Sequence, residues 1–149
     1  TMADALARHY DTVGRIAFAE EDYESASEIY LQAKNLRSIG GNIALLAHSD
    51  GNLAGVAGML GDWEGAALAF ESVALLWTTL GDVKMATIGT LNYSECMVEL
   101  SKRAHSEEKK SFYVDKARKH LTEVQEVLDR LGASDLQNIR DELFKRLSD

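Results

Sequence analysis

The sequence contains no proline and one cysteine among its 149 residues. Average usage near 5% would supply about seven prolines, so their absence favours long helices joined by short turns of Gly, Asp and Asn. A single cysteine excludes a disulfide framework and a cysteine-based zinc or iron–sulfur cage within one chain. This usage predicts a reducing, cytoplasmic setting.

Long apolar runs and positive charge are also scarce. No run approaches the roughly 20 residues of a membrane span, and no secretory signal opens the chain. The formal net charge of −8 argues against a general binder of nucleic acid or anionic membranes. Because 46% of the residues are hydrophobic, the chain can bury a real core. These features predict a folded protein whose partners are neither membranes nor nucleic acids.

The residue patterns of catalytic and metal sites are missing as well. The histidines do not form the HxxxH or HExxH spacing of zinc sites, and neither a phosphate-binding glycine loop nor a nucleophile elbow occurs. Cys96 falls on a helix face where a small core residue is expected. The sequence therefore predicts no metal, no cofactor and no enzymatic activity.

Apolar residues instead recur every three or four positions, which is the pattern of amphipathic helices. One such stripe runs through Tyr23, Ala26, Tyr30, Ala33, Leu36 and Ile39. The chain is predicted to be all-α, with helices over 3–19, 23–39, 42–60, 63–80, 83–101, 107–131 and 135–147.

An internal repeat accompanies these helices. The segment from Glu20 to Ala33 aligns with the segment from Leu60 to Val73 at an offset of forty residues. In each segment the aspartate is expected to cap a helix, and Gly61 to take a left-handed conformation just before its cap. Gly40 and Gly81 are expected to end the second helix of each unit.

A third unit shows a different character. The turn Lys102–Ser111 is expected to be about eleven residues longer than its counterparts, and Lys102–His120 holds seven Lys/Arg against three Asp/Glu. This basic stretch is either a docking site for an acidic partner or an exposed turn with solubilising charge. The last helix is expected to open with a capping box at Ser134 and Gln137.

These residues resemble the tetratricopeptide repeat (TPR), in the forty-residue variety of kinesin light chains, partner-of-inscuteable adaptors and Rap/PlcR-type regulators. The first unit matches through Tyr10, Val13, Gly14, Ala17, Ala26, Tyr30 and Ala33, and the second through Leu53, Ala54, Ala57, Ala66, Phe70 and Val73. The resemblance implies a right-handed α–α superhelix, a solenoid of three helix pairs in a single domain over 1–149. The repeats would cover about 3–41, 42–82 and 83–132, with a capping helix over 134–147. Three units make a short array, so we expect a longer parent protein.

The same resemblance implies a scaffold that binds a protein or peptide in a concave groove. Such repeats place an asparagine on the inner helix to hold a ligand's backbone, and the matching positions are Asn52 and Asn92. An alternative is that these amides bridge neighbouring helices. Helix phase adds Asp11, Phe18 and Glu99 to the expected lining. The expected binding residues are Asn52, Asn92, Arg8, Arg15, His48, Gly55, Met59 and Glu95.

Two further alternatives stay open. The glycines Gly51, Gly55 and Gly58 either provide a floor for a ligand or allow a neighbouring helix to pack closely. The protein is either a simple scaffold, a sensory domain that takes a signalling peptide within a larger regulator, or a module that self-associates into a homo-oligomer.

Overall fold

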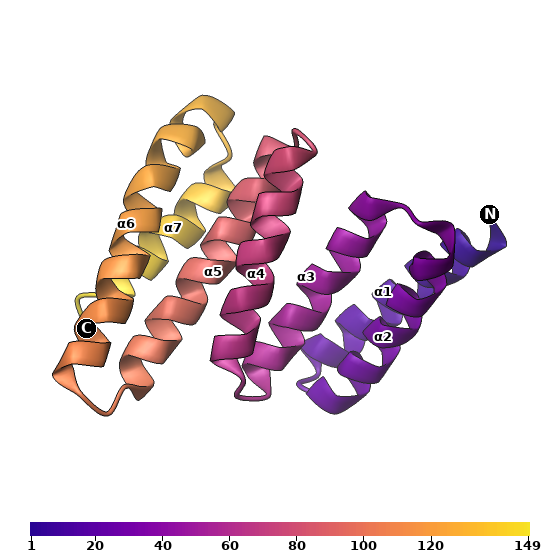
Figure 1. Cartoon of the computed structure of the whole chain (residues 1–149), viewed down its shortest axis with the longest axis horizontal. Coiled ribbons are helices and arrows are strands. Elements are labelled where there is room, and N and C mark those ends of the chain that lie inside the picture. Colours follow the sequence, from indigo (N-terminus) through magenta and orange to yellow (C-terminus); the bar gives the residue numbers. More distant parts are fainter. The chain divides into compact units, whose positions relative to one another are not determined.

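The structure, a computed structural model, describes residues 1–149 as helices joined by short turns, with no strand (Figure 1). The helices are α1 (Met2–Ala19), α2 (Tyr23–Gly40), α3 (Ile43–Met59), α4 (Trp63–Thr79), α5 (Val83–Arg103), α6 (Glu107–Leu131) and α7 (Ser134–Arg146). All seven expected helices are confirmed, with ends within two residues of the prediction. None of them combines the length and the apolar character that a membrane crossing requires.

Side-chain caps begin the helices where the repeat predicts them. The Asp22 carboxylate accepts from the backbone N–H of Ser25 at 3.3 Å, and that of Asp62 accepts from Gly65 at 2.9 Å. Each cap satisfies one of the four N–H groups that a helix start leaves without a partner. The expected caps at the repeated aspartates are therefore confirmed.

The turns before these caps require a left-handed residue. Gly61 takes φ +102°, whereas the equivalent position of the first repeat is Glu21 with φ +62°. A residue with a Cβ is strained there by roughly 1–2 kcal/mol. The end of α2 differs from the prediction, because Gly41 (φ +68°) is its left-handed cap and Gly40 is still helical.

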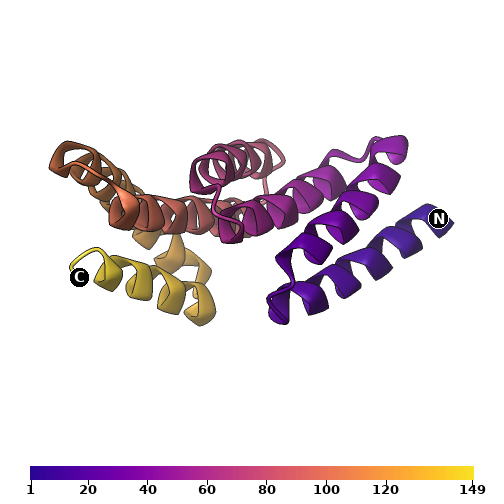
Figure 2. The ribbon, with the colours of Figure 1, turned by 90° about the horizontal axis from the view of Figure 1, so that it is seen from below.

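By Cα packing the chain divides into two compact units, Thr1–Gly65 and Ala66–Asp149. In the first unit α1 packs on α2 and α2 on α3 (Figure 2). Its core gathers Ala17 from α1, Ala26 and Tyr30 from α2, and Val56 from α3. A Cβ on Gly14 would lie 2.6 Å from the Tyr30 ring, so this glycine is what lets α1 approach α2.

In the second unit α5 and α6 form the most extensive helix pair, and α7 packs against both of them (Figure 1). Leu91, Val98 and Leu121 are fully buried in this unit. Gly89 of α5 lies against α4, since a Cβ there would come within 3.0 Å of the Ala74 methyl. Small residues thus set the helix spacing in both units.

The expected long turn in the third helix pair is wrong. α5 continues to Arg103 and α6 begins at Glu107, so the basic stretch is mostly helical rather than a loop. The additional residues lengthen the helices, which have 21 and 25 residues against 17 in α3 and α4. Ser106 caps α6 by accepting from the N–H of Lys109 at 3.1 Å, which supports the start of the helix at Glu107.

The capping box expected at Ser134 is also wrong. The N-cap of α7 is Ala133, without a side-chain cap. Gln137 instead exchanges two amide hydrogen bonds, at 2.8 and 2.9 Å, with Gln125 of α6. Tertiary packing between α6 and α7 gives this side chain a better partner than the local backbone.

Candidate functional site

Four of the residues predicted to bind a ligand form a stripe along α3. His48, Asn52, Gly55 and Met59 fall within about 60° of one another at 3.6 residues per turn. His48 and Met59 are exposed, while Asn52 and Gly55 are half-buried. The Asn52 amide makes no hydrogen bond within the chain, so it is free to donate to and accept from a ligand.

The three glycines of α3 have different surroundings. A Cβ at Gly58 would meet the Trp63 ring at 2.8 Å, so this glycine serves close packing. A Cβ at Gly51 or Gly55 would meet nothing within 4 Å. Close packing therefore accounts for one of the three, and the other two leave the backbone of α3 open along the stripe.

The cationic residues expected on α1 remain exposed. Arg8 and Arg15 lie two turns apart on one face of α1, and Arg15 reaches only the Thr12 hydroxyl, at 3.4 Å. Neither guanidinium forms an ion pair within the chain. Both are thus able to contact a carboxylate of a ligand.

Asp11 does not line this surface, contrary to the expectation. It is 9% exposed, and its carboxylate pairs with Arg37 of α2 at 2.7 Å. Arg37 is 4% exposed and donates a second hydrogen bond, of 2.9 Å, to the Ser49 hydroxyl of α3. The three side chains connect α1, α2 and α3, a structural role that helix phase alone had not indicated.

The same buried network affects a neighbouring phenol. Burial raises the pKa of Tyr30, and the nearby Asp11 carboxylate raises it further. One oxygen of Asp11 (Oδ1) and the Nε of Arg37 remain without a partner in the chain. The sequence did contain a signal for this buried network. Arg37 falls on the apolar side of α2, at the same helix phase as Ala26, Tyr30 and Ala33.

The second unit places Asn92 and Glu95 on one face of α5, together with Glu99. Asn92 and Glu95 are half-buried, and the Asn92 amide makes no hydrogen bond within the chain. Burial raises the pKa of the Glu95 carboxyl above its ordinary range, which Arg146 partly offsets. This face therefore presents a free amide beside a carboxyl that would gain from a hydrogen-bond donor or cation on a ligand.

Glu99 is engaged in the fold rather than free for a ligand. Its carboxylate forms ion pairs with Arg103 of α5 and Arg146 of α7. Burial by itself would raise the pKa of Glu99, but the hydrogen bonds from both arginines outweigh it and lower the pKa. Glu99 thus helps to hold α7 in place.

The predicted binding residues therefore divide between the units. The first unit holds Arg8, Arg15, His48, Asn52, Gly55 and Met59, and the second holds Asn92 and Glu95. Within the first unit the four residues of α3 form one continuous stripe. Cys96 is 1% exposed, which confirms it as a core residue, and burial raises the pKa of its thiol to about 12.

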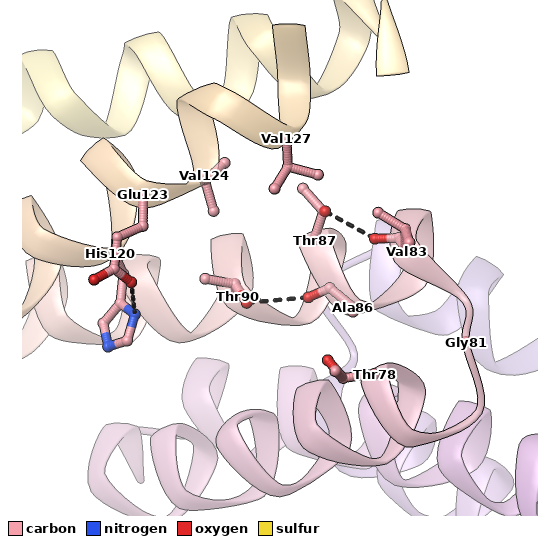
Figure 3. Close-up of a pocket in the computed structure, with 10 residues that line it drawn as sticks. All are labelled: Thr78, Gly81, Val83, Ala86, Thr87, Thr90, His120, Glu123, Val124 and Val127. Carbon is pink, nitrogen blue, oxygen red and sulfur yellow. Dashed lines mark hydrogen bonds and ion pairs between the residues drawn. The ribbon is translucent and has the colours of Figure 1, made fainter. Parts of the chain in front are cut away.

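A separate hollow of about 310 Å³ lies between α4, α5 and α6, and it contains none of the predicted residues (Figure 3). Thr78, Thr87 and Thr90 line it, but each hydroxyl donates to a carbonyl of its own helix, at 2.9, 2.8 and 3.1 Å respectively. Each hydroxyl therefore uses its one proton within its own helix and can only accept from a ligand.

One polar group stands at an end of this hollow. His120 lies 3.8 Å from the Glu123 carboxylate (Figure 3). Its ring also packs edge-on against the Tyr93 ring, at 5.0 Å between centroids. Burial lowers the pKa of His120, and Lys119 and Lys116 act in the same direction against Glu123. The hollow therefore offers mostly apolar contact, with His120 and Glu123 at one end.

Comparison with protein-family models gave no match to this chain, and comparison with curated proteins gave no significant relative.

Proposed function

We propose that the protein is a TPR-like module that binds a peptide or protein segment and performs no chemistry itself. In this proposal three helix pairs form a right-handed superhelix and α7 covers its last face. The ligand contacts the α3 stripe of the first unit, and the half-buried face of α5 that carries Asn92 is proposed as a binding surface of the second unit. The sequential packing of neighbouring helices and the repeated turns at forty-residue spacing support this arrangement.

The observation that carries the proposal is the open floor of α3. Three glycines cost a helix roughly 1 kcal/mol each, yet only Gly58 has a packing partner that requires it. At Gly55 the backbone is accessible beside the unpaired amide of Asn52. A ligand's main chain approaches closely there, and one amide side chain satisfies both its N–H and its C=O.

The neighbouring side chains define what such a ligand carries. Met59 offers a flexible apolar contact, and it is 43% exposed. Arg8 and Arg15 favour an acidic residue in the ligand, and the Glu95 carboxyl of the second unit favours a donor. We propose an extended or helical peptide with an apolar anchor and at least one carboxylate, bound in the cytoplasm, where the buried Cys96 stays reduced.

The test is a selection from a phage-displayed random peptide library, followed by fluorescence polarisation with the enriched peptide. Gly55→Leu fills the open floor, where a Cβ meets nothing within 4 Å, and we expect it to weaken binding at least tenfold. Asn52→Ala/Asn92→Ala should weaken it by a similar factor. The control is Asn35→Ala/Asn138→Ala, which removes two exposed amides elsewhere.

Unchanged circular dichroism of all variants is required for this comparison. Equal binding by the wild type and Gly55→Leu would overturn the role of α3, and equal binding by the double asparagine variant would overturn the role of the amides. A library that yields no peptide would overturn the proposal as a whole.

A further inference from the structure

The basic stretch of the sequence becomes, in the structure, one face of α6. Phe112, Lys116 and Lys119 fall within about 60° of one another at 3.6 residues per turn, and we call them the α6 stripe. All three are exposed; Phe112 is 56% exposed, and the Lys116 ammonium lies 5.5 Å from the centre of its ring. Glu123, the next residue on this face, lies 3.8 Å from His120 and has the opposite charge to the lysines, so the stripe ends at Lys119.

An exposed aromatic ring beside lysines favours a partner that offers an apolar side chain and negative charge. Lys102–His120 has seven Lys/Arg against three Asp/Glu, whereas the rest of the chain has nine against twenty-one. The acidic residues are therefore concentrated elsewhere on the same protein. Neither Lys116 nor Lys119 forms an ion pair within its own chain.

The outer face of α2 carries the complementary pattern. Glu24, Glu28 and Leu31 fall within about 60° of one another by the same helical count, and we call them the α2 stripe. All three are exposed, with Leu31 at 48%. Neither glutamate has an ion-pair partner within the chain.

The two stripes match in spacing when the helices run antiparallel. With Leu31 opposite Phe112, Glu24 and Lys119 each lie seven residues away, about 10.5 Å along their axes. Glu28 lies three residues from Leu31 and Lys116 four from Phe112, about 4.5 and 6 Å. One register therefore brings an apolar pair and two opposite-charge pairs together.

We propose that the α6 stripe of one copy docks antiparallel on the α2 stripe of a second copy. Leu31 packs on Phe112, Glu28 pairs with Lys116, and Glu24 pairs with Lys119. The ammonium of Lys116 then lies between an aromatic face and a carboxylate, both of which attract it. Because the two surfaces differ, the contact is heterologous and each chain offers one of each.

Other occupants fit the stripe less well. Glu108 and Asp115 flank it, and carboxylates in these places repel the continuous negative charge of a nucleic acid or an anionic bilayer. A partner with discrete charges at helical spacing avoids them. The α2 stripe has that spacing, and it belongs to the same protein at the same concentration.

A two-helix contact of this size is weak, so the test uses sedimentation equilibrium at up to about 1 mM chain and moderate salt. The wild type is expected to exceed its monomer mass of 16.4 kDa as concentration rises. Lys116→Glu/Lys119→Glu and Glu24→Lys/Glu28→Lys should each lower the association constant at least tenfold. Mixing the two variants should restore association, because the reversed charges are again complementary.

Phe112→Ala should reduce the association constant without changing the charge. The matched control is Lys84→Glu/Lys145→Glu, which makes the same charge change at two exposed lysines outside the stripe and should associate as the wild type does. A wild type that stays monomeric throughout would overturn the proposal, as would a failure of the mixed variants to restore association.

A second arm identifies the competing occupants. Binding of a monomeric wild type to vesicles rich in phosphatidylserine, or to a synthetic acidic helical peptide, with loss in Lys116→Glu/Lys119→Glu, would assign the stripe to that ligand and overturn the self-contact.

Discussion

In the first unit the polar contact that joins the helices is buried, whereas in the second unit the corresponding contacts are partly exposed. The Arg37 and Asp11 side chains are 3% and 13% exposed, against 24% and 16% for Arg146 and Glu99. The second unit adds the Gln125–Gln137 amide pair and a 3.1 Å hydrogen bond from Arg140 to the Leu121 carbonyl. Burial makes the loss of one partner far more costly, since water cannot replace it.

The two units also differ in where their sequences place charged and polar residues. The first unit inserts a charged residue into the apolar face of α2 and gives it two partners on different helices. The second unit buries only uncharged polar side chains, such as Ser94, and places its ion pairs along the border of α7. A single substitution should therefore damage the first unit more than the second.

The largest effect is expected for Arg37→Ala. It leaves the buried Asp11 carboxylate without its cation, which typically costs 3–5 kcal/mol of the free energy of unfolding. Urea unfolding followed by circular dichroism measures this loss. Arg146→Ala is the counterpart in the second unit, and its partly exposed contact should cost about 1 kcal/mol or less.

Replacing the buried ion pair of the first unit with apolar residues tests the same comparison. Asp11→Leu/Arg37→Met removes both charges and should cost less than Arg37→Ala alone, because no uncompensated charge remains. Equal losses for Arg37→Ala and Arg146→Ala would contradict the distinction between the units.

The next effect concerns the glycines that set helix spacing. Gly14→Ala places a methyl group 2.6 Å from the buried Tyr30 ring, and such overpacking typically costs 1–3 kcal/mol. Gly55→Ala meets nothing within 4 Å, so it should instead gain up to about 1 kcal/mol from helix propensity. Thermal unfolding of both variants gives opposite shifts if the assignment is right, and a stabilised Gly14→Ala would refute it.

A smaller effect is expected at the repeated turn. Glu21 has the positive φ that Gly61 has in the second repeat, so Glu21→Gly should raise the free energy of unfolding by about 0.5–1 kcal/mol. Gly61→Ala should lower it by a similar amount. Chemical denaturation of the two variants is the measurement, and a loss for Glu21→Gly would show that the glutamate side chain contributes more than its backbone strain.

The smallest effect is a pH dependence in the second unit. Burial raises the pKa of Glu95, so ionisation of this carboxyl destabilises the folded state at pH above its folded pKa. Glu95→Gln should therefore be more stable than the wild type at pH 7. The difference should shrink as the pH falls through that pKa and the wild-type carboxyl becomes protonated.

The pKa shift of Glu99 has the opposite sign, so this residue provides the control. Its pKa is lowered in the folded state, so its stabilisation is present above the unfolded pKa and is lost as the pH falls through the folded pKa. Glu99→Gln should be less stable than the wild type at pH 7 and should approach it in acid. Parallel pH profiles for the two variants would contradict these directions.

Local physics explains why the helices were predictable from the sequence. Apolar periodicity identified all seven helices, and the paired aspartates with their preceding left-handed residues marked the repeated turns. These signals act over a few residues, and they do not depend on what the helix packs against. The glycine floor of α3 and the free amides of Asn52 and Asn92 also lie on faces that helix phase assigns.

Tertiary packing decided the features that the sequence misassigned. Asp11 has the phase of a surface residue, but Arg37 draws it into a buried pair. Gln137 has the spacing of a capping residue, but Gln125 offers it two hydrogen bonds across the α6–α7 contact. In both cases the folded chain brought a distant partner within hydrogen-bonding reach of a polar side chain.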